Sequence, residues 1–233
     1  NLIPAPNKGK TTAVMGMEDG DATDSQLWMY QGTKTKTGTW FEKAGFTNGT
    51  AYVLAQDPSA PVANDNEIRS NYGKGKAFKV KFAKIDTKLN GKLQNDQARE
   101  NGIELARVED GAFDPKKPND FYFVTTESNK DPKATAPNPA TPTVSRDGGA
   151  LWRLRFADVA NPSKGGTLEM LLDGSEEPFL SKPDNITVDP AGNVLIQEDP
   201  GNNAQIARVV SYRISDGKLA TIAKFKDTYF NSA

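Results

Sequence analysis

The 233-residue sequence contains no histidine and no cysteine. These absences exclude a Ser-His-Asp triad, a cysteine nucleophile, a histidine general base and a zinc site built on imidazole or thiolate ligands. Oxygen ligands remain, because hard cations such as calcium and magnesium bind carboxylates and carbonyls. The 30 Asp and Glu residues therefore keep one kind of metal chemistry open.

Long apolar runs and an excess of one charge are also missing. No stretch reaches the roughly 18 consecutive apolar residues of a membrane span, so no membrane partner is expected. The net charge is −1, which removes the general electrostatic case for a nucleic-acid partner. Residues 1–10 lack the apolar centre of a signal peptide, so we expect a chain that is mature, trimmed or a piece of a longer protein.

Turn-forming residues are plentiful by comparison. The 20 glycines and 15 prolines occur in short bursts between apolar runs, and this pattern favours many turns and short strands over long helices. The sequence predicts a mainly β protein.

An internal repeat organises the second half of the chain. Leu105–Ser128 and Leu180–Asp199 share an acidic pair, an apolar alternation, an Asp-Pro step, a turn and a second apolar run that leads to a glutamate. Aligning the Asp-Pro steps, Asp114 on Asp189, places Glu109 on Asp184 and Asp110 on Asn185.

Each repeat continues into two further strand-like segments, so we predict four-stranded antiparallel units at about 105–174 and 180–227, and a partial unit at 12–85 whose first strand is missing. Such repeated units are typical of β-propeller blades. The alternative is a β-sandwich with an accidental similarity between two hairpins. A propeller needs at least about four blades to close. We therefore expect one propeller portion, either a fragment or a piece that assembles with the remainder of the protein or with another copy.

Three segments break the strand pattern. Lys92–Ile103 has the composition of a short helix that ends at Gly102. Residues 57–76 and 129–149 are rich in Pro, Ala, Asn and Ser and read as mobile insertions, either lids over a site or plain exposed loops.

Acidic residues recur at equivalent places in the units. Two lie at the starts of first strands and three at the ends of second strands, which share one end of a blade. We expect the five to face one mouth of the central channel, where crowded carboxylates are tolerated by solvation, by sharing protons or by binding cations. Calcium, with six to eight oxygens, fits this set; the alternative is that they are solvated turn residues. The predicted metal ligands are Glu18, Glu109, Glu127, Asp184 and Glu198, with Asp110, Asn185 and Asp199 as additional or supporting groups.

Four other side chains invite a functional interpretation. Trp28 and Trp152 occupy matching third-strand positions and are expected to pack blades rather than bind ligands. Arg153 and Arg155 alternate on one strand and could reach a phosphate, although a solvent-facing position or a salt bridge is the simpler interpretation. The sequence identifies no catalytic residue and no residue that binds the substrate phosphate.

Several segments resemble the PhoX-type alkaline phosphatases of cyanobacteria and other bacteria. They are VMGMEDGDATDSQLWMYQGTKTKTG, ELARVEDGAFDP, GGALWRLRF and KPDNITVDPAGNVLIQEDPGN, and the similarity runs along most of residues 12–227. Members of the family are much longer, so the chain resembles only their later part. The resemblance implies a six-bladed type of propeller, a periplasmic or secreted location, and hydrolysis of small phosphate monoesters by calcium and iron ions held by glutamates, here Glu18 and Glu109 with Glu127, Asp184 and Glu198 as companions.

One departure bears on the cofactors. The family's iron site uses a cysteine, which this chain lacks, so iron requires a ligand outside this chain or is absent. The leading hypothesis is a metal-dependent phosphate monoester hydrolase in which a metal-activated water or oxide attacks phosphorus. The alternatives are a non-catalytic, calcium-stabilised propeller module and, through KPDNITVDPAGN, a propeller lactonase.

Overall fold

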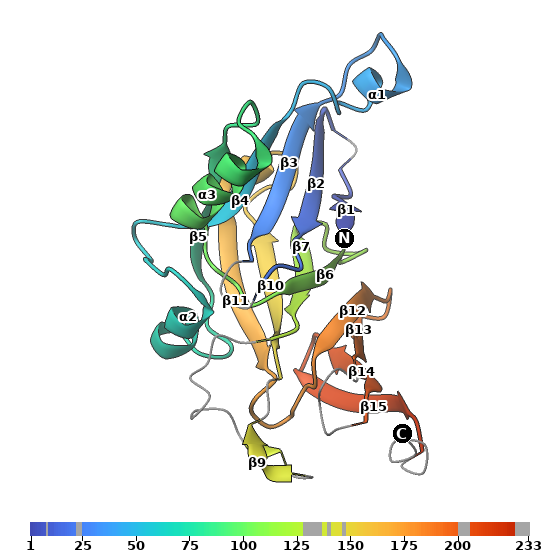
Figure 1. Ribbon diagram of the computed structural model, residues 1–233. Coiled ribbons are helices and arrows are strands. Elements are labelled where there is room, and N and C mark those ends of the chain that lie inside the picture. Colours follow the sequence, from blue (N-terminus) through green and yellow to red (C-terminus); the bar gives the residue numbers. More distant parts are fainter. Residues whose placement is uncertain are drawn as a thin grey trace.

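The computed structural model describes residues 1–7, 9–21, 25–127, 137–138, 141–145, 148–199 and 206–226, with the backbone alone at 137–138 and 141–145. It is built mainly from antiparallel strands in two sheets (Figure 1). The larger sheet has nine strands in the order β1-β2-β3-β4-β5-β11-β10-β7-β6. They are β1 (Leu2–Pro4), β2 (Thr11–Met17), β3 (Leu27–Thr33), β4 (Thr50–Gln56), β5 (Phe78–Ile85), β6 (Val108–Phe113), β7 (Asp120–Thr125), β10 (Ala150–Phe156) and β11 (Gly166–Asp173).

The smaller sheet follows in chain order and lies beside β6 and β7 (Figure 1). It consists of β12 (Pro183–Val188), β13 (Asn193–Glu198), β14 (Arg208–Arg213) and β15 (Lys218–Lys224). A short hairpin is formed by β8 (Pro137–Asn138) and β9 (Thr141–Ser145). The described helices are α1 (Trp40–Lys43), α2 (Asp65–Asn71), α3 (Gly91–Asn101) and the 3-10 turn η1 (Pro162–Lys164).

The nine-stranded sheet consists of a five-stranded half, β1–β5, and a four-stranded half, β6, β7, β10 and β11, which meet where β5 pairs with β11. β5 and β11 pair over three residue pairs, from Gly166 opposite Val80 to Leu168 opposite Phe78. At the other edge β2 and β6 come into contact, so the sheet curls almost into a closed barrel. One apolar core fills the interior and takes side chains from both halves, including Met29 and Trp152.

Alternation along the strands decides which side chains enter that core. In β5, Phe78, Val80 and Phe82 are buried, whereas the lysines between them are exposed. This two-residue period is what a half-buried strand requires. The second sheet packs on the outside of the barrel through a separate core, in which Tyr122 and Leu151 from the first sheet meet residues such as Ile196.

The predicted all-β fold of four-stranded antiparallel units is confirmed. Strands β2–β5, β6-β7-β10-β11 and β12–β15 form three such groups. The first group also has an edge strand, because Leu2–Pro4 pairs with β2 where the sequence interpretation found no first strand. Three residues are too short to show a period, which explains why β1 was not predicted.

The helices lie outside the barrel. The predicted helix at Lys92–Ile103 is confirmed: the Asn90 side chain caps its start and Gly102 ends it. Residues 57–76, expected as an insertion, carry α2, whose Ile68 is fully buried in the first core. The expected insertion at 129–149 lies largely outside the described residues. Within the described part of the chain, no helix is long and apolar enough to cross a membrane.

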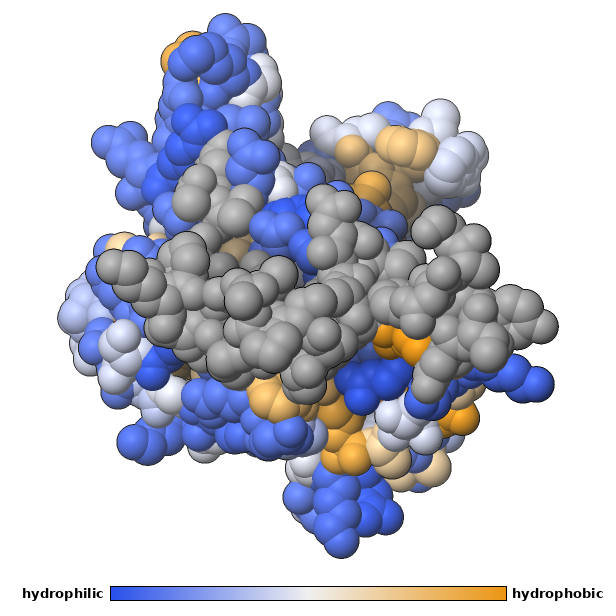
Figure 2. Space-filling model, turned by 60° about the horizontal axis from the view of Figure 1, so that its bottom comes forward, coloured by the Kyte–Doolittle hydropathy of each residue, from blue (hydrophilic) through white to orange (hydrophobic). Residues whose placement is uncertain are grey.

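The described residues on the face shown in Figure 2 are mostly hydrophilic. Figure 2 shows apolar colour in separate patches on the face turned forward there. Large apolar side chains that are exposed include Trp40 in α1, and Ile222 and Phe225 near the end of the second sheet.

Candidate functional site

Two charged residues begin the second and third groups of strands with a left-handed backbone. Arg107 has φ of 59° and Lys182 has φ of 45°, and they are the non-glycine residues with positive φ in the described part of the chain. Arg107 directly precedes β6 and Lys182 directly precedes β12. The Arg107 carbonyl accepts the Thr126 amide at 3.0 Å, and the Lys182 carbonyl accepts the Asp199 amide at 2.8 Å. A strained backbone of this kind costs about 1–3 kcal/mol and is concentrated at functional sites.

The Arg107 guanidinium lies among three carboxylates. It donates to Asp19 Oδ1 from Nε at 2.9 Å and from Nη2 at 2.8 Å. It also reaches Glu109 Oε1 at 3.1 Å and Glu127 Oε1 at 3.2 Å. Lys182 donates to the same Glu127 oxygen at 2.9 Å. These residues, with Asp184 and Asp199, are called the charged cluster below, and all three groups of strands contribute to it.

Two pairs of carboxylates within the cluster lie in contact. Burial raises the pKa of Glu109 to about 8, and the hydrogen bond and charge of Asp19 add to the effect, as does the charge of Asp184. Burial also raises the pKa of Asp184 to about 6, together with the charge and hydrogen bond of Asp199. Like charges this close must share a proton or be neutralised by a cation.

The pKa of Glu127 is shifted in the opposite direction. Burial alone would raise its pKa, but the hydrogen bonds and charges of Lys182 and Arg107 outweigh burial and lower it. Glu127 is therefore the ionised acceptor of the cluster, held between an ammonium and a guanidinium group.

The structure thus brings together three of the five predicted ligands: Glu109, Glu127 and Asp184. Of the supporting residues, Asp199 belongs to the cluster and Asn185 donates to Asp184 Oδ1 at 3.0 Å. Asp110 is buried and tethers other segments.

The contacts of Asp110 show this tethering directly. Asp110 accepts the Asn1 side-chain amide at 2.9 Å and the Ile186 backbone amide at 3.0 Å. It therefore joins the edge of the first group of strands to β12.

Glu18 and Glu198 have other partners. Glu18 Oε2 accepts the Trp28 indole N–H at 2.7 Å, and its neighbour Asp19 reaches Arg107 in its place. Glu198 is buried and binds Arg208 through two guanidinium nitrogens at 2.6 and 2.8 Å. It also accepts the Ser181 amide at 2.9 Å.

The residues that sequence reasoning missed are Asp19, Arg107 and Lys182. Two signals were available. The tripeptide Glu-Asp-Gly occurs at 18–20 and again at 109–111, so either acid of the first pair was a candidate. The alignment of the two repeats also places Arg107 opposite Lys182, a cation opposite a cation.

The other singled-out residues are structural. Trp152 is fully buried in the first core, as its packing role predicted. Arg155 binds both carboxylate oxygens of Asp120, at 2.6 and 2.7 Å, and Arg153 pairs with Glu169. The salt-bridge interpretation of both arginines is therefore the one that the structure supports.

The chemistry of the donor set fits a hard cation. The acidic side chains of the cluster present carboxylate oxygens, which calcium and magnesium prefer. Among the described residues, however, no group of three or more acidic side chains is arranged as a ready metal site. The carboxylates lie instead in pairs, with Arg107 bound to Asp19 and Glu109 and with Lys182 bound to Glu127.

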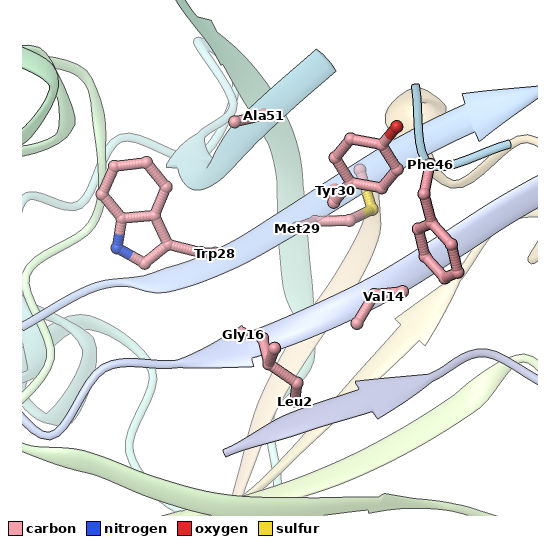
Figure 3. A pocket seen from close by; sticks show the side chains of 8 residues that line it. All are labelled: Leu2, Val14, Gly16, Trp28, Met29, Tyr30, Phe46 and Ala51. Atoms are coloured by element: carbon pink, nitrogen blue, oxygen red, sulfur yellow. The ribbon is translucent and has the colours of Figure 1, made fainter. Parts of the chain in front are cut away.

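An apolar groove of about 310 Å³ lies on the outer face of strands β1–β4 (Figure 3). Trp28 and Tyr30 project into it from β3, and Phe46 closes one end. The remaining lining residues are Leu2, Val14, Gly16, Met29 and Ala51.

The antiparallel four-stranded groups define a propeller-type β protein, and the charged cluster lies where three of these groups come together. Residues 6–230 match the family described as alkaline phosphatase PhoX, so the chain belongs to that family. No curated protein matches the chain.

Two solved structures are similar. One is Pseudomonas fluorescens PhoX in complex with vanadate, a transition-state analogue, with 15% identity and a TM-score of 0.66. The match covers 95% of this chain and 43% of that chain, so this chain spans less than half the length of that relative. The other is a luciferin-regenerating enzyme, with 11% identity, a TM-score of 0.37, and coverage of 97% of this chain and 62% of that chain.

Proposed function

We propose that this chain carries part or all of the site of a metal-dependent phosphate monoester hydrolase. The observation that carries the proposal is the charged cluster, in which the carboxylate pair Glu109–Asp19 contacts Arg107 and the second pair, Asp184–Asp199, lies close enough to interact with the first. Membership of the alkaline phosphatase PhoX family supports the reaction class. The vanadate complex of the Pseudomonas relative supports a phosphate ester as substrate.

The proposed cation ligands are Glu109, Asp19, Asp184 and Asp199, and the proposed cation is calcium. Divalent cations supply charge neutralisation of phosphoryl oxygens and a bound water of lowered pKa when they are present. The set is limited to the carboxylates that lie in pairs, whereas Glu18, Glu127 and Glu198 are bound by Trp28, by Lys182 and Arg107, and by Arg208. The cysteine of the family's iron site has no counterpart in this chain, so either that ligand comes from elsewhere or the iron site is absent.

The protein's own groups have distinct tasks in this scheme. The carboxylates act as ligands and not as proton carriers, because each pair is neutralised when it binds a cation. Asp110 holds the cluster in place by joining Asn1 and Ile186. The Glu127–Arg107 ion pair fixes the start of β6, from which Glu109 projects.

Chelation tests the proposal. The chelated chain is assayed on a chromogenic phosphate ester before and after calcium is restored. We expect activity to disappear with chelator and to return with calcium, and Glu109→Gln to bind calcium more weakly without unfolding. Glu100→Gln, on the exposed face of α3, is the matched control. Activity indifferent to chelation, or an unchanged calcium isotherm in Glu109→Gln, would remove the assignment.

The alternatives appear as other outcomes of the same assay. Calcium binding without turnover would make the chain a cation-stabilised binding or structural module, and turnover of a lactone in place of a phosphate ester would make it a lactonase. Four further points stay predictions: the correspondence to the later part of a family member, a six-bladed ring, a periplasmic or secreted location, and assembly with the remainder of the protein or another copy.

A further inference from the structure

Lys182 forms an ion pair inside the cluster. Its side chain is 19% exposed, and its Nζ lies 2.9 Å from Glu127 Oε1. Fixing a lysine side chain costs conformational entropy, and removing its ammonium group from water costs solvation free energy. The partly buried ammonium is therefore maintained by its carboxylate partner.

The backbone conformation at Lys182 is a second, independent cost of having a side chain at this position. Its φ of 45° is a conformation that glycine adopts without penalty. Pro183 follows directly and restricts this residue further. The Asp199 amide bonds to the Lys182 carbonyl at 2.8 Å and fixes the turn. A side chain at this position thus costs stability, and the contact that it makes is with Glu127.

Glu127 Oε1 is occupied on both sides. It accepts from Arg107 Nη1 at 3.2 Å and from Lys182 Nζ at 2.9 Å. An oxygen with two cationic donors is a poor ligand for a third cation.

We propose that Lys182 is a built-in counter-cation whose ammonium group keeps Glu127 from coordinating a divalent cation bound at the carboxylate pairs, and so limits the affinity of the cluster for that cation. Lys182 is a positioning residue in this scheme. The inference rests on the proposed function only for the presence of a bound cation, and not for hydrolysis.

Calorimetric titration of the chelated 233-residue chain with calcium tests the proposal. Lys182→Met is expected to bind calcium about tenfold more tightly than the wild type, because the ammonium charge of the cluster is lost and Glu127 Oε1 keeps Arg107 as its one remaining cationic donor. Lys182→Arg keeps the charge and is expected to bind within twofold of the wild type. The double variant Lys182→Met/Glu127→Gln is expected to lose most of the gain.

A matched control and a second variant complete the design. Lys81→Met removes an exposed lysine of β5 and should leave the isotherm unchanged. Lys182→Gln keeps a hydrogen-bond donor without the charge, so it serves if the methionine variant does not fold, and it too should bind calcium more tightly.

The proposal would be overturned if folded Lys182→Met or Lys182→Gln bound calcium as weakly as the wild type or more weakly. It would also be overturned if neither the wild type nor the variants bound calcium. Because turnover is not measured, a chain that binds calcium as expected but hydrolyses no phosphate ester would support this inference and refute only the hydrolase.

Discussion

Substitution of Glu198 by Gln separates a structural role from a metal-binding one. The Glu198 side chain is fully buried, whereas its partner Arg208 is 24% exposed. The carboxylate accepts hydrogen bonds from the backbone amides of Ser181 and Arg208, at 2.9 and 3.1 Å, in addition to those from the guanidinium. It joins β13 to β14 and to the segment before β12.

The expected loss follows from these contacts. Gln keeps the size of Glu but presents an NH₂ group to donors that need an acceptor, and it leaves the guanidinium without its counter-charge. Removing one partner of a buried ion pair typically costs about 3–5 kcal/mol. Because Arg208 keeps some access to water, we expect the lower part of this range, about 3 kcal/mol, and a fall in melting temperature of roughly 10 °C.

Urea and thermal unfolding, with a calcium titration alongside, measure this effect. Asp216→Asn is the matched control, because it removes an exposed arginine–carboxylate pair from the same sheet; such pairs contribute less than about 1 kcal/mol. If Glu198→Gln left stability unchanged and weakened calcium binding, the structural assignment would be refuted and Glu198 would be a ligand.

Two further predictions concern the cluster and the core. The raised pKa values of Glu109 and Asp184, about 8 and about 6, mean that the folded chain holds these protons more tightly than the unfolded chain. Their contribution to stability is complete below about pH 4 and is lost as the pH rises through 6 and 8. As the pH is raised from 5 to 8.5, the urea midpoint of the chelated wild type should therefore decrease relative to that of Glu109→Gln. A relative increase would contradict the assignment. Gly111→Ala places a Cβ 2.2 Å from the ring of the buried Phe121, so we expect about 2 kcal/mol of destabilisation by urea unfolding; a neutral effect would show that the ring moves aside.

Much of the fold could be predicted because the strands carry their pattern locally. Alternating apolar residues and Asp-Pro turns recur in Leu105–Ser128 and Leu180–Asp199, and both repeats form the expected hairpins. The closure of the first sheet could not be predicted, because pairing of β5 with β11 depends on residues far apart in the chain.

The alternation of buried and exposed residues along a strand could also have narrowed the set of predicted metal ligands. Val194, Ile196 and Glu198 lie two residues apart on one buried face of β13, so the side chain of Glu198 points into the core. Position at a strand end does not by itself show which face of the strand a side chain occupies.

Glu18 also lies at the end of a strand, but on the outer face of that strand. It follows Val14 and Gly16 on the outer face of β2, where the Trp28 indole N–H donates a hydrogen bond to its carboxylate. The cationic residues were harder to foresee, because a left-handed backbone at Arg107 or Lys182 has no signature in a non-glycine sequence.

The three-residue seam between β5 and β11 has a consequence for the order of folding. Each half of the barrel grows mainly from neighbours in the chain, whereas the seam must bring residues 78–80 to residues 166–168 and pay the entropy of closing that long loop for a short ladder. The halves are therefore expected to form first and the barrel to close last. The large aromatic side chains of the interior then remain accessible to water until the final step.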